Sequence, residues 1–462
     1  MAETGIQKAF ESPGVFWLPE NTEQIISGQL SHSLDDGPRV NLVGSFGASI
    51  LPRNFAIVYG VLDNAPCTLF NCRQISSKSS YGGLQQVVLE ADVLLVGEHI
   101  SSLDEPAFSG AKVRFGGLDE WVNFSAIKIG AWQADPSNKP SRFDIVTQPP
   151  ISSKVEAIGS LVTLAGSQNG SFGYLKIDWE HHSFFEALPE KPTSIRELFK
   201  STFELQHLFA LLTWTRAPVS YFSMLRIIPI NAMNPTGKRW SGLYGHWAMT
   251  PHDYKPSSHL LTYLADVYDA LPQIIASWFQ SSSAIKTSRN LLTSIVRSEG
   301  QYLQFKFLAL MQTVEAAHRS FDAKNYMPEA DYKMVCQILT ASIPDTVSED
   351  HKASLKSRIK FGNELSLRTR FKELFLKLPE SLRPHICNDW KTFVEQAVDM
   401  RNAQTHPNTD GTAKEPDLNQ IWQACQRIKL LLTIVFLNEL GLSFENIEKI
   451  AANISWRSFV RD

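Results

Sequence analysis

The stretch "YLQFKFLALMQTVEAAHRSF" (Tyr302–Phe321) carries a single apolar stripe. Its members are Leu303, Phe307, Leu310, Val314, Ala317 and Phe321. Their 4-3-4-3-4 spacing follows one face of an α-helix, whereas a half-buried strand would alternate at every second residue. The stretch therefore predicts a long amphipathic helix inside a helical domain.

Helical periodicity extends on both sides of this stretch, from about Ser258 to the end of the chain. Further helices are expected at about 328–342, 348–361, 366–378, 386–400, 418–440 and 444–453. Ser348, followed by Glu349 and Asp350, provides an N-cap and an acidic first turn for the second of these. The C-terminal part is therefore predicted to be an all-α bundle.

The chain before this region has a different period. Up to about Asp178, short apolar runs such as "NFAIVYGVLDN" and "QQVVLEADVLLVG" are separated by Gly, Asn, Asp, Ser and Pro, as in an antiparallel sandwich or barrel. Residues 111–132, 156–166 and 172–179 show the same pattern. A helix follows at about 194–214 with Ser194 as its N-cap, and two strand-like runs come after it. We predict an α+β multidomain protein: a β-rich domain at 1–285, containing that inserted helix, and an all-α domain at 286–462.

The bulk composition is that of an ordinary globular chain. Its 462 residues are 43% hydrophobic and 20% charged, with a net charge of −3, so nucleic acid or membrane would have to be met by a local patch. Five scattered cysteines favour free thiols in a reducing cytosol. The start of the chain lacks a signal-peptide pattern, and the most hydrophobic run, "LLLTIVFL" (430–437), is too short to span a bilayer. We expect a cytoplasmic protein without a membrane partner.

The segment "VDMRNAQTHPN" (398–408) places an Arg and a His at a helix end. Arg401 continues the helical face of Val394 and Ala397, where a cation needs an anionic partner or a ligand phosphate. Pro407 disfavours helical backbone at His406, so the imidazole can swing back toward Arg401. Alternatively, both cations merely interact favourably with the negative end of the helix dipole.

Such a pair suits cleavage of RNA without a metal. Histidine can transfer a proton to or from an oxygen near neutral pH. Arginine can hold a phosphate with two hydrogen bonds while negative charge builds up. The 2′-hydroxyl would be the nucleophile, so DNA would be spared.

A basic patch lies upstream of this pair. It comprises Lys352, Lys356, Arg358, Lys360, Arg368, Arg370 and Lys372. Only one acid, Glu364, interrupts it, as contacts with RNA phosphates would require. An ordinary solvated helix face explains the composition equally well.

Other motifs do not support a metal or a cofactor. His181 and His182 in "EHHSF" are adjacent and lack a third ligand in the sequence. "NPTGKRW" lacks the spacing of a phosphate-binding loop. The acid pairs at 104–105 and 119–120 are expected to be solvated turns. We therefore predict neither metal nor cofactor.

The Arg–His segment resembles the HEPN superfamily of ribonucleases, whose mark is R-x4-H at the end of a helix with a polar residue after the Arg. Arg401, Asn402 and His406 fill these places. "FGNELSLRTRFKELF" (361–375) and "LMQTVEAAHRS" (310–320) are similar to the ApeA-like HEPN branch. "GVFWLPEN" (14–21) and "VRFGGLDEWV" (113–122) are similar to the ApeA N-terminal domain.

The resemblance implies a bacterial abortive-infection protein that acts against phage. It implies a HEPN homodimer that cuts RNA without metal and leaves a cyclic phosphate, with tRNA or other host translation RNA as the suggested substrate class. The phage trigger that activates it is not identified by the sequence. Asn408 stands where some HEPN toxins carry a tyrosine, so nucleotidylation there is not expected. The alternatives are an RNA-binding dimer that does not cut, and a sensor scaffold.

Three residues of the 302–321 helix have two interpretations. Glu315 and His318 occupy positions where a bundle helix would be apolar. With Arg319, they would orient Arg401 and His406. Otherwise they form a local pair on one helix, worth about 0.2–0.5 kcal/mol.

Overall fold

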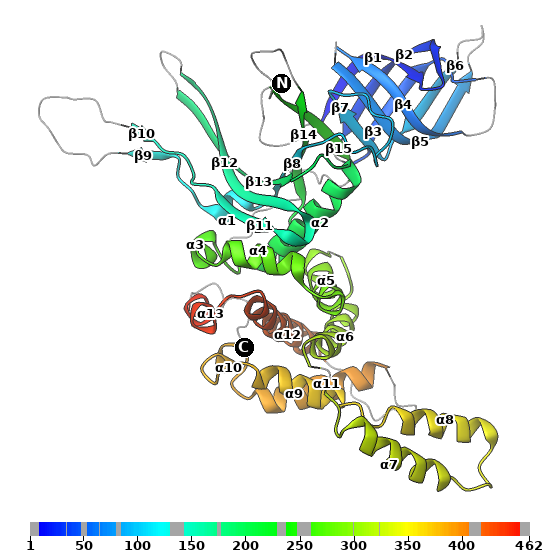
Figure 1. Cartoon of the computed structure of the whole chain (residues 1–462), viewed down its shortest axis with the longest axis vertical. Helices are drawn as coiled ribbons and strands as arrows, with labels where there is room; N and C mark the ends of the chain where they lie inside the picture. Colours follow the sequence, from blue (N-terminus) through cyan, green and yellow to red (C-terminus); the bar gives the residue numbers. More distant parts are fainter. Residues whose placement is uncertain are drawn as a thin grey trace, which may run out of the picture. The chain divides into compact units, whose positions relative to one another are not determined.

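The computed structural model of the chain consists of two compact units, Met1–Gln280 and Ser281–Asp462, called here the N-terminal and C-terminal units (Figure 1). The described residues are 9–33, 35–47, 53–63, 65–79, 85–129, 143–172, 177–228, 237–246, 260–298, 300–322, 324–405 and 417–452. The boundary expected between residues 285 and 286 falls inside the first helix of the C-terminal unit, α5 (Ser283–Arg297).

A closed β-barrel forms the first part of the N-terminal unit. Its strands are β1 (Phe10–Leu18), β2 (Asn21–Ser33), β3 (Gly37–Val43), β4 (Asn54–Leu62), β5 (Ala65–Ser79) and β6 (Gln85–Glu90). They are antiparallel in the order β5-β4-β1-β2-β3-β6, and β6 pairs back with β5 to close the ring. Side chains alternate between the two faces of each strand, so Ile26, Leu30 and His32 of β2 are all buried inside. Ile26 and Leu30 join Phe16 and Val40 in the barrel core.

The same sheet continues beyond the barrel as an open, twisted part (Figure 1). Its strands are β7 (Val93–Val96), β8 (Gly110–Phe115), β11 (Ile151–Val155), β12 (Ser160–Phe172), β13 (Ile177–Pro189), β14 (Val219–Ile228) and β15 (Gly237–Gly245). The strand β7 pairs with β5, and the order from there is β7-β15-β14-β8-β13-β12-β11. A separate hairpin is formed by β9 (Ile127–Ile129) and β10 (Phe143–Ile145).

Short helices and one long helix pack against this open part. They are α1 (Leu118–Val122), the 3-10 turn η1 (Glu156–Ile158), α2 (Ile195–Thr213), α3 (Leu264–Val267) and α4 (Leu271–Gln280). Ser194 caps α2 as expected, because its side chain accepts a hydrogen bond from the backbone N–H of Glu197 at 3.2 Å. Phe209 of α2 stacks on Phe115 of β8 with ring centroids 5.7 Å apart, which fixes the apolar face of α2 on the sheet.

The described part of the C-terminal unit is helical. Besides α5, it contains α6 (Leu303–Phe321), α7 (Glu329–Ala341), α8 (Glu349–Lys360), α9 (Leu367–Leu376), α10 (Arg383–Ile386), α11 (Trp390–Thr405), α12 (Leu418–Glu439) and α13 (Phe444–Ala451). The helix α6 contacts α5, α9, α11 and α12. Its predicted stripe faces these neighbours: Phe307, Leu310, Val314 and Ala317 are completely buried.

The helix α12 contacts α5, α6, α9 and α10. Its apolar run at 430–437 is buried throughout, so α12 is a core helix of the unit. Among the described residues no helix combines the length and hydropathy needed to cross a membrane. In contrast, α7 and α8 pair as a hairpin in which Tyr332 is the buried residue.

The predicted fold class is confirmed, with two local corrections. The run 111–132 was expected to be strand, but it contains α1, because Gly117 adopts φ 89° and begins a helical turn with Asp119 and Glu120. That acid pair therefore lies in a helix rather than in a loop. The helix expected at 386–400 begins at Trp390 and continues to Thr405, since Pro407 constrains only the residue directly before it.

Candidate functional site

Arg401 and Asn402 lie in the last turn of α11, which ends at Thr405. Arg401 is half-buried, and its Nη1 donates a hydrogen bond to Asn402 Oδ1 at 3.2 Å. Thr405 Oγ1 donates to the Arg401 carbonyl at 3.0 Å, which closes the helix end. Within the described residues Arg401 forms no ion pair with a carboxylate, so its guanidinium can still bind an anion. His406 lies outside the described residues.

The side of α11 before Arg401 is held by α9 through ion pairs. Arg368 reaches two successive turns of α11: its Nε lies 2.7 Å from Glu395 Oε2 and its Nη2 lies 2.6 Å from Asp399 Oδ1. Lys372 Nζ lies 2.5 Å from the other oxygen of Glu395 and lowers the pKa of that carboxyl group. Arg368 and Lys372 were predicted to contact RNA, but acids of the same unit already neutralise both.

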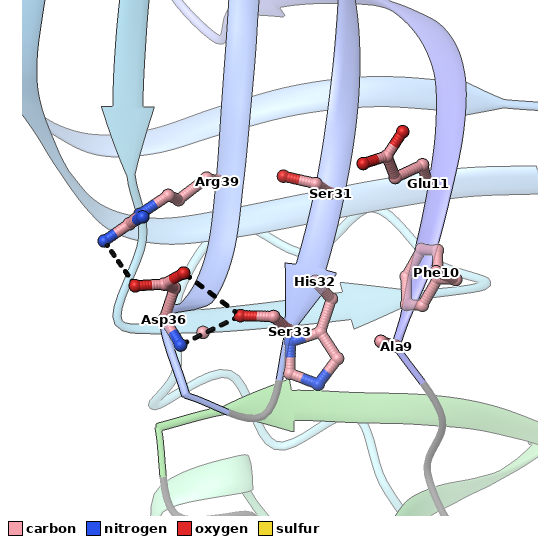
Figure 2. Close-up of a pocket in the computed structure, with 9 residues that line it drawn as sticks. Ala9, Phe10, Glu11, Ser31, His32, Ser33, Asp36 and Arg39 are labelled. Carbon is pink, nitrogen blue, oxygen red and sulfur yellow. Dashed lines mark hydrogen bonds and ion pairs between the residues drawn. The ribbon is translucent and has the colours of Figure 1, made fainter.

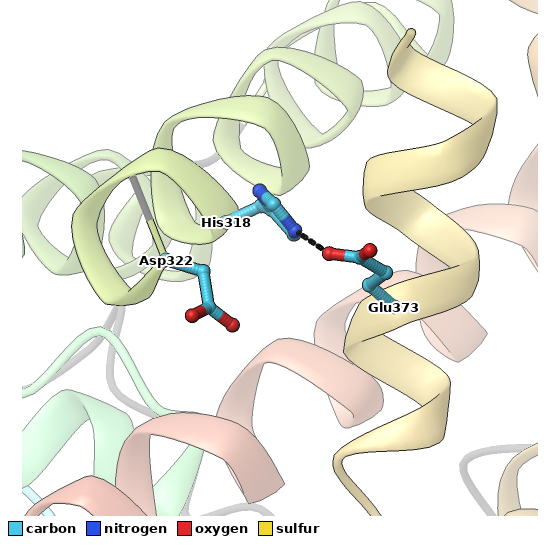
Figure 3. A group of neighbouring side chains, drawn as sticks. All are labelled: His318, Asp322 and Glu373. Atoms are coloured by element: carbon cyan, nitrogen blue, oxygen red, sulfur yellow. Dashed lines mark hydrogen bonds and ion pairs between the residues drawn. The ribbon is translucent and has the colours of Figure 1, made fainter. Parts of the chain in front are cut away.

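Arg370 occupies the opposite side of α9 and points into the protein. Only 3% of it is exposed. Its Nε donates to the Leu365 carbonyl at 2.9 Å, and its Nη1 lies 3.2 Å from His318 Nδ1. Because a guanidinium can only donate, His318 accepts at Nδ1 and carries its proton on Nε2, which lies 2.6 Å from Glu373 Oε2 (Figure 3). This burial does not fit the RNA-contacting role expected for Arg370.

Glu315 and Arg319 form an ion pair along α6 at 2.9 Å. The same Arg319 Nη2 lies 2.5 Å from Glu364 Oε2, which connects α6 to the turn before α9. Together with His318, these residues therefore join α6 to α9. No hydrogen bond or ion pair joins them to Arg401 in the described part of the unit, so their role in orienting Arg401 and His406 stays a prediction.

His318, Asp322 and Glu373 bring possible ligand atoms within 4.8 Å of one another, so a metal ion must be considered (Figure 3). A metal would need the Nε2 lone pair of His318, but that nitrogen carries the proton donated to Glu373. Asp322 already lies 3.1 Å from Lys377 and 3.6 Å from Lys324. Burial opposes ionisation of Asp322, yet the two lysines outweigh it and lower the pKa. The donor set therefore suits an ion-pair network better than a cation.

The remaining members of the predicted basic patch, Lys352, Lys356, Arg358 and Lys360, lie on α8. Lys352 is half-buried, and its Nζ lies 3.0 Å from Glu349 Oε1. The other three are exposed. Lys360 Nζ lies 5.6 Å from the centre of the Phe361 ring, and half of that ring is exposed as well. This part of the patch remains available to a phosphate backbone.

Comparison with known protein families agrees with both units. The model of ApeA N-terminal domain 1 matches residues 11–278, and the model of the Apea-like HEPN domain matches residues 308–446. The chain belongs to the ApeA family. Neither curated proteins nor solved structures provide a match.

Membership of the ApeA family gives the chain a coarse function, because Apea-like HEPN proteins are antiphage nucleases. In this ApeA protein the HEPN match covers α11 and the segment that follows it. Sequence reasoning missed Glu373, Glu395 and Asp399. The burial of Arg370 could have been predicted from the sequence, because Arg370 and Leu374 are four residues apart and lie on the same, buried face of α9.

Proposed function

We propose that this ApeA protein is an endoribonuclease that cuts RNA without a metal, by attack of a 2′-hydroxyl on the adjacent phosphate. Arg401 would hold the phosphate and stabilise the charge that builds up on it. His406 would transfer a proton to or from a reacting oxygen. Asn402 would fix the Arg401 guanidinium through the 3.2 Å hydrogen bond between them.

The observation that carries the proposal is the place where α11 ends. Arg401 and Asn402 occupy the last described turn of α11, which runs to Thr405, and His406 is the next residue in the sequence. A cation without a carboxylate partner among the described residues, five positions before a histidine in the sequence, suits a dianionic transition state. The family's nuclease function supports the same reading.

One copy of the chain supplies a single Arg and a single His for three tasks: base, acid and phosphate clamp. We therefore propose that two copies meet at a twofold axis near α11 and form a composite groove. RNA would be the partner in that groove, with tRNA as the suggested class. The N-terminal unit would sense a phage product, and the reaction would take place in the cytoplasm.

The experiment compares purified wild type, His406→Ala and His385→Ala on total bacterial RNA in EDTA. His385 is an exposed histidine on α10 and serves as the matched control. We expect wild type and His385→Ala to produce new ends with a cyclic phosphate, and His406→Ala to produce none while folding normally. Cleavage by His406→Ala at the wild-type rate, or cleavage that disappears in EDTA, would contradict the proposed chemistry.

A further inference from the structure

The helix α7 has an apolar stripe that is open to solvent in the described structure. Its members are Ala330, Met334, Ile338 and Ala341, called here the α7 stripe. Their 4-4-3 spacing places them on one side of the helix. All four are exposed, and the two large side chains are exposed most of all: Met334 by 61% and Ile338 by 66%. A stripe with this spacing is normally found where a helix faces another helix.

The side of α7 that faces α8 is a different one. Tyr332 is buried, its hydroxyl donates to the Ile359 carbonyl of α8, and Cys336 Sγ lies 3.7 Å from the same carbonyl. Met334 follows Tyr332 by two residues, which is about 200° round the helix, so the α7 stripe points away from α8. Figure 1 shows α7 and α8 side by side.

The α7–α8 hairpin has little core of its own. The two helices have 13 and 12 residues, Tyr332 is the buried residue of α7, and no residue of α8 is buried. Helices shorter than about 12–15 residues are marginal alone, and packing of an apolar face supplies most of their stability. A helix packed on the α7 stripe would therefore stabilise the whole hairpin.

The order of residues along the α7 stripe is self-complementary for an antiparallel pair. When Met334 of one copy is level with Met334 of a second copy, Ala330 is level with Ile338, because these two positions lie four residues on either side of Met334. Each isoleucine then meets an alanine, as close packing of two helices 8–10 Å apart requires. A twofold axis at Met334 produces this arrangement, in which the same surface serves both copies.

The charged residues beside the α7 stripe favour the same orientation. In the antiparallel pair, Asp331 is level with Gln337 of the second copy and Lys333 is level with Val335 of the second copy, so each charge meets an uncharged residue. A parallel pair would bring Asp331 level with its own copy and Lys333 level with its own copy, and like charges repel. RNA fits the stripe poorly, because none of its four residues is charged or polar.

We propose that the α7 stripes of two copies of this chain pack against each other in antiparallel orientation, about a twofold axis at Met334. This surface is separate from the contact proposed near α11, since no stripe residue lies on α11, and it does not depend on RNA cleavage. A helix of 13 residues is about 20 Å long, so one such pair buries less than the roughly 1,200 Å² of a standard interface. The contact is therefore weak and reversible, and forms at micromolar protein concentration.

Oxidation of cysteine variants of the full-length protein reads the register directly. The background carries Cys336→Ser and Cys387→Ser, because these two of the five free cysteines are not fully buried. At micromolar concentration Met334→Cys should form a disulfide-linked dimer. Ala330→Cys and Ile338→Cys should each stay unlinked alone, because identical positions are then about 12 Å apart along the axis, but should link when the two proteins are mixed. Ser354→Cys, at an exposed position of α8, is the matched control and should stay unlinked.

Three outcomes would overturn the contact. They are equal linking of Met334→Cys and Ser354→Cys, absence of linking in the mixed pair, and linking of Ala330→Cys or Ile338→Cys alone as fast as in the mixture. Adding Ile338→Asp to the Met334→Cys protein should slow linking at least tenfold, whereas adding Ser354→Asp should not. Linking should be unchanged by His406→Ala, so failure of this contact and failure of the proposed cleavage are observed separately.

Discussion

Arg368 and Arg370 lie two residues apart on α9, and replacing each by methionine should have very different effects. Arg370 is buried, and its guanidinium holds His318 and the Leu365 carbonyl. The Arg368 side chain is 40% exposed and pairs with acids on the surface of α11. Methionine approximately retains the volume of the arginine stem in both cases, so the comparison isolates the charge and its hydrogen bonds.

The loss of stability expected for Arg370→Met follows from the groups that the substitution leaves without a hydrogen-bond donor, the Leu365 carbonyl and His318 Nδ1. Each hydrogen bond from a charged donor contributes about 1.5–3 kcal/mol, and Arg370 makes two of them inside the unit. Breaking a buried charged network by removing one partner costs about 3–5 kcal/mol, which agrees with that sum. Exposed pairs such as those of Arg368 contribute about 0–1 kcal/mol. In a domain of the size of the C-terminal unit (Ser281–Asp462), a loss of 1 kcal/mol lowers the melting temperature by about 2–4 °C. A loss of about 3–5 kcal/mol in Arg370→Met should therefore lower it by roughly 6–20 °C.

The assay is thermal and urea unfolding of the full-length protein, followed by circular dichroism at a helical wavelength. The two single variants and wild type are compared at one salt concentration. RNA binding is measured in parallel below the melting temperature of the weaker variant. If Arg370→Met melts like Arg368→Met and binds RNA less tightly than wild type, Arg370 is a surface contact and the reasoning from its burial is refuted.

Three further predictions follow from the same structure. Arg401→Lys keeps the charge but loses the two-pronged donor, so single-turnover cleavage at saturating RNA should lose roughly 2–4 kcal/mol of barrier lowering, while binding of uncut RNA hardly changes. Replacing Lys356, Arg358 and Lys360 by glutamine should weaken RNA binding. The slope of log affinity against log salt concentration should become shallower by about one unit for each phosphate contact that is lost. The cleavage rate at saturating RNA should not change. Burial lowers the pKa of His32 (Figure 2) to about 4, so between about pH 6.5 and pH 4 the unfolded chain binds a proton at His32 that the folded barrel does not bind. The free energy of unfolding should therefore be highest above about pH 6.5 and fall as the pH is lowered toward 4. Urea unfolding at several pH values should show a flatter pH dependence for His32→Phe than for wild type.

The fold could be predicted from the sequence wherever the determining pattern is local. The stripe of α6 repeats with the helical period, and its four central members, Phe307, Leu310, Val314 and Ala317, are completely buried. The capping of α2 by Ser194 depends on residues within one turn. Closure of the barrel is different, because it depends on β6 pairing back with β5 after β3 has paired with β6. Nothing in the period of a single strand specifies that pairing, so the sequence left sandwich and barrel as alternatives.

In the candidate site, too, the features set by the local sequence pattern could be predicted, and those set by contacts between helices could not. The position of Arg401 on α11 follows from the helical period, and the apolar face that leads to it is buried as expected. The partners of the basic residues could not be inferred, because Glu395 and Asp399 lie on a different helix from Arg368. A count of charges between residues 352 and 372 treats all cations as free, whereas tertiary contacts bury one of them and pair two others with acids.

These tertiary contacts change how the electrostatics of the C-terminal unit should work. On one side of α9, Arg370 and Glu373 bind His318 and hold α9 to α6. On the other side, Arg368 and Lys372 bind the acids of α11. The α9 cations therefore add little field toward a polyanion, but they fix the helix that carries Arg401. Under the proposed function, the exposed cations of α8 would attract RNA, and Arg401, whose charge no described acid offsets, would bind one phosphate.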